Sequence, residues 1–254
     1  MTKILLADKK NFINEFSLTL EKRKVYQNKN LLEVKRIIQD VKSNKDKAIL
    51  KYEKKFSLKK NISIQSIKFT KSEIKKSINL LDNKVKKSID TAFLRIKYFH
   101  QKQKAHSFSY KDKFDNQLSY KYSPMEKIGV YVPGGTASYP SSVLMNCIPA
   151  IVAGVKNIYL TTPAFGSEVN PAIIYAAKKC GVKEIYKTGG AHSIAAFTYG
   201  TKTFKKVNKI VGPGNAFVAS AKKEVYGEVG IDMVAGPSEV SIVADKFANS
   251  RWIA

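Results

Sequence analysis

The sequence predicts an α/β fold, in which helices cover both faces of a mostly parallel sheet and a helical segment precedes it. Two observations support this class. From about residue 124 onward, short apolar runs of strand length alternate with helical patterns, often across glycines. Before that point, residues 1–125 are polar and mainly helical in their spacing of apolar positions. The chain has 254 residues, 44% of them hydrophobic, which suffices for one large or two ordinary domains with a buried core.

The N-terminal half predicts mainly helices. Apolar positions three and four residues apart indicate a helix over residues 31–41, capped by Asn28 or Asn30, and a second short helix over 48–52. Alternating apolar residues predict a strand over 62–69. The remaining elements expected here are helices at 74–79 and 82–100, and an extended hairpin at 110–122 with its turn at Asp115-Asn116.

In the C-terminal half, predicted strands and helices alternate. The helix over 170–179 has clear end signals, since Pro171 stands at its first position and Gly181 follows its last turn. The interval between elements is typical of a parallel sheet covered by helices. Strands are expected at residues 128–133, 157–161, 185–186, 209–211 and 239–243, and helices at 141–153, 170–179, 194–197 and 215–225.

Several strand-to-helix loops of this sheet contain glycine, namely Gly134-Gly135, Gly189-Gly190 and Gly212-Pro213-Gly214-Asn215. Ligands bind parallel sheets at the carboxyl ends of the strands, and glycine lets backbone N–H groups approach a phosphate. These loops therefore favour a nucleotide site, although tight turns alone also need glycine. The usual dinucleotide fingerprint is absent, because its third glycine position after Gly212 holds Phe217.

The formal net charge of +25 leaves two interpretations open, a polyanion partner or a solvated lysine-rich surface. Residues 1–130 carry 32 Lys and Arg against 13 Asp and Glu, and they are also rich in Asn, Ile, Ser and Phe. That bias is typical of A/T-rich codons, and the chain lacks RNA-binding and zinc-finger signatures. We therefore expect no nucleic-acid partner, and a basic nucleic-acid-binding protein is kept as the alternative of another class.

The sequence contains neither an apolar run of membrane-spanning length nor the pattern of a secretory signal, so we expect a cytoplasmic protein without a membrane partner. Cys147 and Cys180 lie in apolar helical patterns, which favours buried reduced thiols over catalysis. Of the three histidines, His100 and His106 lie in a lysine-rich segment and are expected to be structural. His192 follows a glycine loop and is a candidate ligand contact.

Three strings resemble histidinol dehydrogenase: EKIGVYVPGG at residues 126–135, KIVGPGNAFV at 209–218 and IDMVAGPSEV at 231–240. PSSVLM at 140–145 also fits, and the order and spacing match the family over residues 124–254. The resemblance implies a Rossmann-like NAD-binding domain over residues 131–237. It also implies that residues 1–130 form a helical segment and part of a first α/β domain, which 238–254 and residues absent from this chain would complete.

The resemblance further implies oxidation of L-histidinol to L-histidine by two hydride transfers, with NAD and zinc as cofactors and a homodimer as the assembly. It assigns NAD contacts to Tyr131, Asn215 and His192, where His192 replaces the family's usual glutamine, and a substrate contact to Ser238. The zinc ligands and the catalytic Glu–His pair are expected beyond residue 254, so we expect the chain to be an inactive fragment. A related zinc- and NAD-dependent dehydrogenase of another small alcohol is the alternative within the family.

Overall fold

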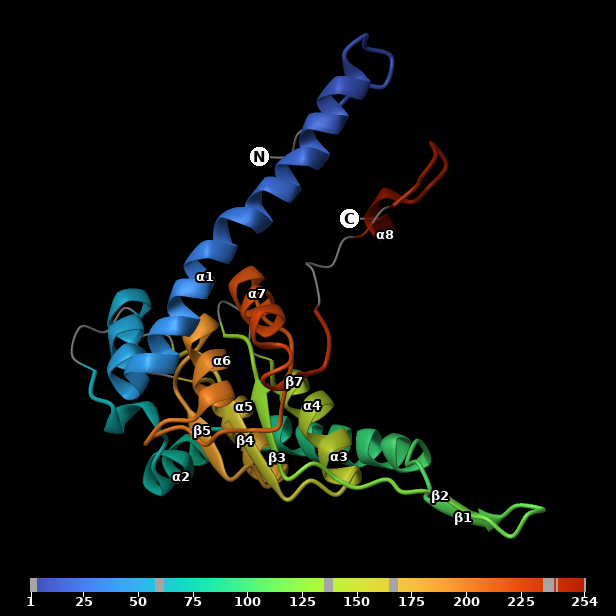
Figure 1. Cartoon of the computed structure of the whole chain (residues 1–254). Helices are drawn as coiled ribbons and strands as arrows, with labels where there is room; N and C mark the ends of the chain where they lie inside the picture. Colours follow the sequence, from blue (N-terminus) through green and yellow to red (C-terminus); the bar gives the residue numbers. More distant parts are fainter. Residues whose placement is uncertain are drawn as a thin grey trace.

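The computed structural model describes residues 4–57, 62–134, 139–164, 169–234, 240 and 242–253, with only the backbone described for 22–30. Figure 1 shows a central parallel sheet with helices on both faces. The strands lie in the order β5-β4-β3-β6-β7, and every pairing in this sheet is parallel. The chain enters at the central strand and builds outward in both directions, which is the order of a Rossmann-like sheet. The strands are β3 (Lys127–Tyr131), β4 (Asn157–Thr161), β5 (Glu184–Tyr186), β6 (Lys209–Val211) and β7 (Gly230–Ile231).

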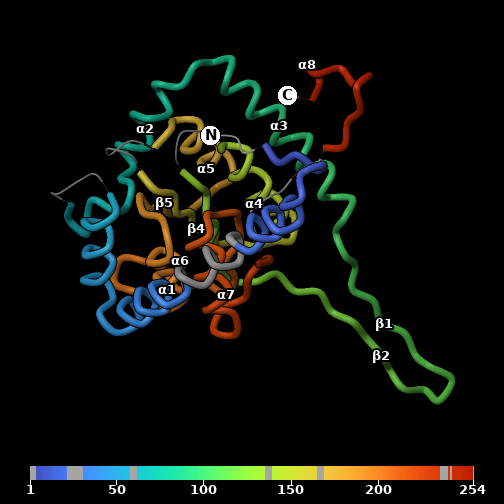
Figure 2. Tube along the Cα trace, turned by 90° about the horizontal axis from the view of Figure 1, so that it is seen from above, coloured from blue at the N-terminus to red at the C-terminus, as the bar shows by residue number. Residues whose placement is uncertain are grey.

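Alternation along β3 explains why both faces are covered. Ile128, Val130 and Val132 are buried in one hydrophobic core, whereas Tyr131 belongs to the other. Figure 2 shows the two helical layers on opposite sides of the strands. The first layer contains α2 (Lys71–Asn79), α3 (Asn83–Lys102), α4 (Pro140–Val152) and α5 (Pro171–Lys179). The second contains α6 (Gly190–Tyr199) and α7 (Ala216–Val225), with α1 (Phe12–Phe56) packed over them.

The long element α1 consists of two helices joined at Lys45, whose backbone has φ 49° and ψ −126°. The two halves lie antiparallel, because Lys55 Nζ is 3.3 Å from Glu33 Oε1 and the Tyr52 hydroxyl donates to Asp40 at 2.9 Å. The helices predicted over 31–41 and 48–52 are therefore confirmed. The predicted cap at Asn28 or Asn30 is wrong, since the helix begins at Phe12 and continues through both positions.

The strand predicted over 62–69 is also wrong. Gln65–Ile67 form a 3₁₀ helix, and the only sheet-like contact described here is an isolated antiparallel bridge between Lys68 and Tyr186. Serine side chains explain the difference, because Ser66 Oγ donates to the Ser63 carbonyl at 2.8 Å and closes a local turn. Such local hydrogen bonds compete with a strand ladder.

The strand predicted over 239–243 is not found in its described residues. Val240, Ile242 and Val243 belong to no strand, and Val243 is fully exposed. A strand needs a neighbour for its backbone groups, and no strand pairing of these residues is found in the described chain. The fifth strand of the sheet is instead β7, which sequence analysis missed because it has two residues.

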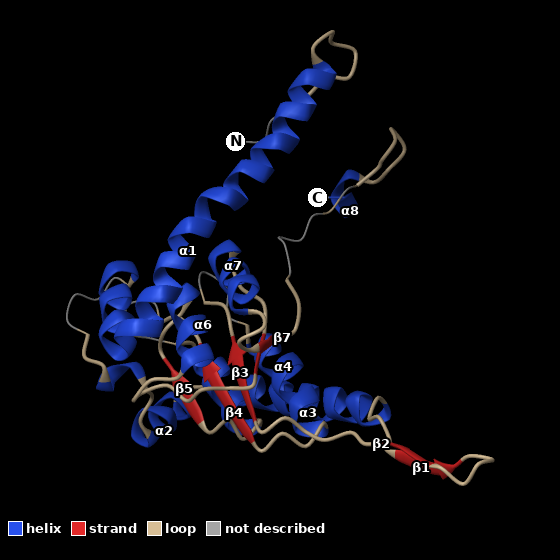
Figure 3. Cartoon of the chain, viewed as in Figure 1, coloured by secondary structure: helices blue, strands red, loops and turns tan. Residues whose placement is uncertain are grey.

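The predicted hairpin is confirmed and projects from the body of the molecule (Figure 3). It consists of β1 (Phe108–Lys111) and β2 (Gln117–Tyr120), paired antiparallel. Asp112 Oδ1 accepts from the backbone of Phe114 at 2.8 Å and of Asn116 at 2.9 Å, which fixes the turn.

A short helix, α8 (Ser250–Ile253), ends the described chain. None of the described helices has the length and apolar character needed to cross a bilayer.

Paired carboxylates should make the fold sensitive to acid. A hydrogen bond from Lys51 holds the pKa of Asp40 below its ordinary value of 3.8, and one from Lys179 does the same for Asp90. Because the pKa is lowered on folding, the stabilisation is complete above pH 3.8 and is lost as the pH falls through the lowered values. We expect the melting temperature to fall between about pH 4 and about pH 2.

The variant Asp90→Asn is the control for this prediction, since it retains the side-chain volume without the titrating group. Its melting temperature should fall less over the same pH interval than that of the parent chain. An identical fall in both proteins would contradict a contribution of the Asp90–Lys179 pair, whose atoms lie 2.8 Å apart.

Candidate functional site

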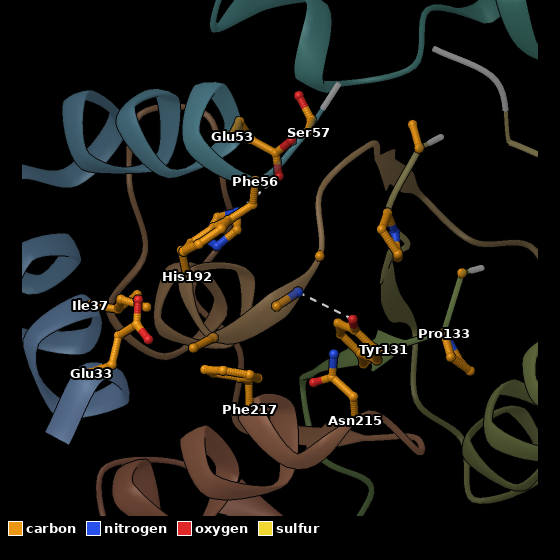
Figure 4. Close-up of a pocket in the computed structure, with 16 residues that line it drawn as sticks. Glu33, Ile37, Glu53, Phe56, Ser57, Tyr131, Pro133, His192, Asn215 and Phe217 are labelled. Carbon is orange, nitrogen blue, oxygen red and sulfur yellow. Dashed lines mark hydrogen bonds and ion pairs between the residues drawn. The ribbon is translucent and has the colours of Figure 1, made fainter. Parts of the chain in front are cut away.

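A cavity of about 390 Å³ opens at the carboxyl ends of the strands, between the sheet and both halves of α1 (Figure 4). This size lies within the usual range of small-molecule sites. The cavity adjoins the switch point between β3 and β6, where the chain order reverses and ligands of such sheets bind. It is lined by Glu33, Ile37, Glu53, Phe56, Ser57, Tyr131, Pro133, Gly134, Pro163, Ala164, Gly189, Gly190, Ala191, His192, Asn215 and Phe217.

Tyr131 ends β3 and lines the cavity while being only 3% exposed. Its hydroxyl oxygen accepts a hydrogen bond of 3.2 Å from the backbone N–H of Gly190. Burial raises the pKa of Tyr131, and the bond from Gly190 opposes this only in part. The hydroxyl therefore keeps its proton, which it can donate to a bound molecule.

Asn215 lies at the N-cap of α7, directly after β6 and its glycine loop. Its Oδ1 accepts from the backbone N–H of Val218 at 3.1 Å, which satisfies one free donor of the helix end. This bond also sets the orientation of the amide, whose nitrogen lies on the side of Tyr131 in Figure 4. Asn215 can thus cap the helix and donate to a ligand at the same time.

The loop that carries Asn215 is held by a buried ion pair. Lys222 of α7 is 3% exposed, pairs with Asp232 and donates to the carbonyl of Gly212 at 3.1 Å. The other oxygen of Asp232 accepts from the N–H of Gly212 at 2.8 Å. Both backbone groups of Gly212 are therefore bonded, and its φ of +112° requires glycine. The pair fixes the start of the loop that leads to Asn215.

His192 lies in the first turn of α6 and is 3% exposed. Its Nε2 lies 2.8 Å from Oε1 of Glu53 and 3.0 Å from Oγ1 of Thr188. The ring packs against the aromatic rings of Tyr52 and Phe56, with centroids 5.9 and 6.1 Å away. Contacts from α1 thus hold His192 in one orientation at the edge of the cavity.

The cavity suits an anionic ligand with polar ends. The N-termini of α6 and α7 both open onto it, and helix N-termini attract negative charge through their free N–H groups. The described residues that line it include the carboxylates of Glu33 and Glu53 and no lysine or arginine, so the attraction for a phosphate comes from these backbone N–H groups alone. A Cβ at Gly189 would lie 2.7 Å from Pro163, so the loop after β5 packs closely against the loop after β4. These features fit a dinucleotide.

The sequence model of the histidinol dehydrogenase family matches residues 20–254. The chain belongs to this family. The histidinol dehydrogenase of Pelagibacter ubique is 56% identical over all of the chain, and that of Mesorhizobium japonicum is 46% identical over 87% of it. The crystal structure of histidinol dehydrogenase from Elizabethkingia anophelis superposes with a TM-score of 0.78 at 40% identity, over 87% of this chain and 51% of that one. The chain spans 58% and 51% of the two bacterial relatives' lengths.

Three of the four binding residues that the resemblance to histidinol dehydrogenase implies, Tyr131, His192 and Asn215, meet at this cavity. Ser238 lies outside the described residues. In the part of the chain that the structure describes, no group of three or more His, Cys, Asp or Glu side chains is arranged to hold a metal ion. The described residues therefore do not by themselves fit a zinc site.

The other candidates lie away from this cavity. His100 and His106 line a separate cavity at the opposite end of the strands, together with Ile128 and Lys209 where β3 and β6 begin. Cys147 and Cys180 are buried free thiols. A hydrogen bond with Cys180, together with burial, raises the pKa of Cys147 well above its ordinary value, which suits the structural role expected for it.

Sequence analysis missed the contribution of α1 to the site. Glu53 and Phe56 line the cavity although they lie far from the glycine loops in sequence. A signal was present, because Ile49, Tyr52 and Phe56 form an apolar stripe at helical spacing and Glu53 falls within it. A carboxylate on a buried helical face needs a partner, and here that partner is His192.

Proposed function

We propose that the chain supplies the NAD-binding part of a histidinol dehydrogenase, which oxidises L-histidinol to L-histidine through histidinal at the end of histidine biosynthesis. The observation that carries this proposal is the meeting of Tyr131, His192 and Asn215 in one cavity at the switch point of the sheet. The names of the relatives support the substrate, since those matched above are histidinol dehydrogenases.

The oxidation of an alcohol to an acid through an aldehyde releases two hydrides, and NAD accepts one hydride in each of the two steps. The residues of this chain bind and orient the dinucleotide. The hydroxyl of Tyr131 and the amide of Asn215, which are oriented by their bonds with Gly190 and Val218, would donate hydrogen bonds to it, and the first turns of α6 and α7 would hold its phosphates.

Several features of the complete enzyme belong to the same proposal. Zinc, its ligands and the catalytic Glu–His pair are assigned to residues that this chain does not contain, and Ser238 is assigned to the substrate. We further propose a homodimer in the cytoplasm. The division at residues 130 and 237 remains a proposal too, with β3 beginning at Lys127.

Two measurements test the function. Isothermal titration calorimetry of the chain with NAD should show saturable binding, and absence of binding would overturn the assignment of the cavity. The complete protein, supplied with zinc, L-histidinol and NAD, should produce reduced NAD and histidine. Activity on another small amino alcohol with none on histidinol would support the related dehydrogenase instead.

Tyr131→Phe tests one predicted contact. Loss of the hydroxyl should weaken NAD binding by about fivefold to tenfold, the usual value of one hydrogen bond, as measured by calorimetry. The fold should persist, because the ring stays in the core. Tyr226→Phe is the matched control, since Tyr226 is 70% exposed and does not line the cavity. Equal affinities of Tyr131→Phe and the parent chain would contradict the contact.

A further inference from the structure

A buried polar cluster joins α1 to the nucleotide cavity. Glu53, Thr188 and His192 are all under 10% exposed and contact one another. The Thr188 hydroxyl donates to Oε1 of Glu53, and both groups lie within 3.0 Å of the Nε2 atom of His192. The Glu53 oxygen comes from the N-terminal helical hairpin, whereas the other two groups belong to the strand-to-helix loop after β5 and to α6.

The proton positions in this cluster follow from its donors and acceptors. An ionised carboxylate only accepts hydrogen bonds, so Glu53 accepts from both neighbours. The single hydroxyl proton of Thr188 is directed to Glu53, which leaves the oxygen of Thr188 as an acceptor toward the ring. Nε2 of His192 therefore faces two acceptors and must carry a proton.

The second ring nitrogen is then left with a lone pair. Nδ1 of His192 is buried and has no hydrogen-bond partner within the part of the chain that is described. A Cβ atom added to Gly190 would lie 3.5 Å from Nδ1, so this nitrogen faces the glycine turn that lines the cavity. Buried polar atoms are nearly always paired, which makes an unpaired one at a binding cavity a marker for a ligand.

We propose that Glu53 is a positioning residue, which holds His192 with its proton on Nε2 so that Nδ1 accepts a hydrogen bond from the nucleoside part of the ligand. This inference rests on the proposed NAD binding. The group bound at Nδ1 is a neutral O–H or N–H donor, as in a ribose hydroxyl or an amide. Phosphate is excluded at this point, because an ionised phosphate oxygen offers no proton and would face a lone pair.

The type of side chain at position 192 determines which ligand groups can bind there. A glutamine, which the resemblance to the family places here, both donates and accepts through its amide. A histidine held by Glu53 only accepts. With histidine at position 192, the side chain can therefore only accept a hydrogen bond from the ligand. Glu53 is needed to hold the ring in the tautomer that does so, and a glutamine would not need it.

The tautomer is tested without any ligand. Nitrogen-15 NMR of the histidine-labelled chain at about pH 8, where an ordinary imidazole is neutral, should show His192 with its proton on Nε2. The sequence has three histidines, and the variant His192→Gln identifies the relevant signals. A proton on Nδ1, or a doubly protonated ring at this pH, would overturn the inference.

Ligand contact is tested by adding NAD to the same sample. The Nδ1 resonance should shift as it accepts a hydrogen bond, whereas inorganic pyrophosphate should leave it unchanged. If calorimetry shows NAD binding and Nδ1 does not respond, the inference fails and the proposed function stands. If NAD does not bind at all, the proposed function fails, and the ligand contact fails with it.

A double-mutant cycle separates positioning from structural support. Glu53→Leu should give a mixture of tautomers and weaken NAD binding by about fivefold to tenfold. In the His192→Gln background the same change should have little effect on NAD affinity, because a glutamine does not need Glu53. Glu228→Leu is the carboxylate control, since its side chain is 57% exposed on the surface. Equal losses of affinity from Glu53→Leu in both backgrounds would show a merely structural role.

Discussion

Gly212→Ala is expected to lower the free energy of unfolding by about 3 kcal/mol or more, and to abolish NAD binding. A Cβ at this position would lie 2.1 Å from the carbonyl oxygen of Tyr131, and φ is +112°. Neither atom can move away easily, because Tyr131 ends the central strand and Gly212 is bonded at both its N–H and its carbonyl. Urea denaturation and calorimetry with NAD measure the two effects.

Gly227→Ala is the matched control for this change. Its φ of +103° is nearly the same, but no atom lies within 4 Å of the added Cβ. It should cost only the backbone strain of about 1 kcal/mol, and NAD affinity should not change. Equal destabilisation in the two variants would mean that backbone conformation, and not the contact with Tyr131, determines the loss.

Lys222→Met should be the second most damaging of the changes considered. Removing one member of a buried pair leaves the other charge without its partner. Here Asp232 is 29% exposed, so water compensates in part and the expected loss is about 2 kcal/mol. Because Lys222 also holds the carbonyl of Gly212, the loop before Asn215 should relax and NAD affinity should fall.

Lys223→Met is the control for Lys222→Met, because the neighbouring lysine is exposed and should tolerate the change. The double variant Lys222→Met with Asp232→Leu should recover part of the lost stability, since no unpaired charge remains. Denaturant unfolding of the parent chain and these three variants measures their free energies of unfolding. If Lys223→Met lost as much stability as Lys222→Met, the loss would come from a change on the helix surface and not from the ion pair.

Patterns confined to one element were predicted well from the sequence. Asn170, Pro171 and Gly181 mark the ends of α5, and the structure shows each in its expected role: Asn170 caps the helix and Gly181 has a positive φ. The run of apolar residues in β3 correctly predicted the central strand, because a strand that is buried on both faces is apolar along its length. Local residue types determine such elements, so they can be read without knowledge of the tertiary structure.

Features that depend on distant partners were not predicted. Val240 has no strand to pair with in the described chain, so the strand expected over 239–243 is not found there. The strand expected over 62–69 failed for a local reason, because the hydrogen bond between Ser66 and Ser63 closes a turn. β7 is a strand only because Ile231 pairs with Ile210 of β6. The same limit applies to the site. Its glycine loops were found, whereas the carboxylate of Glu53 reaches His192 across 139 residues of sequence.

The order of the strands also has a consequence for the sequence of events in folding. β3, β4 and β5 follow one another in the chain and pair in sequence order, so their pairings close shorter loops than the pairing of β6 with β3. β6 must return to β3 from about 80 residues away, and the hydrogen bond that the N–H of Lys127 donates to Oδ1 of Asn208 spans 81 residues. We therefore expect β3, β4 and β5 to gain protection from hydrogen exchange first during refolding. The nucleotide cavity, which needs Asn215 and α1 as well, would form only in the last step.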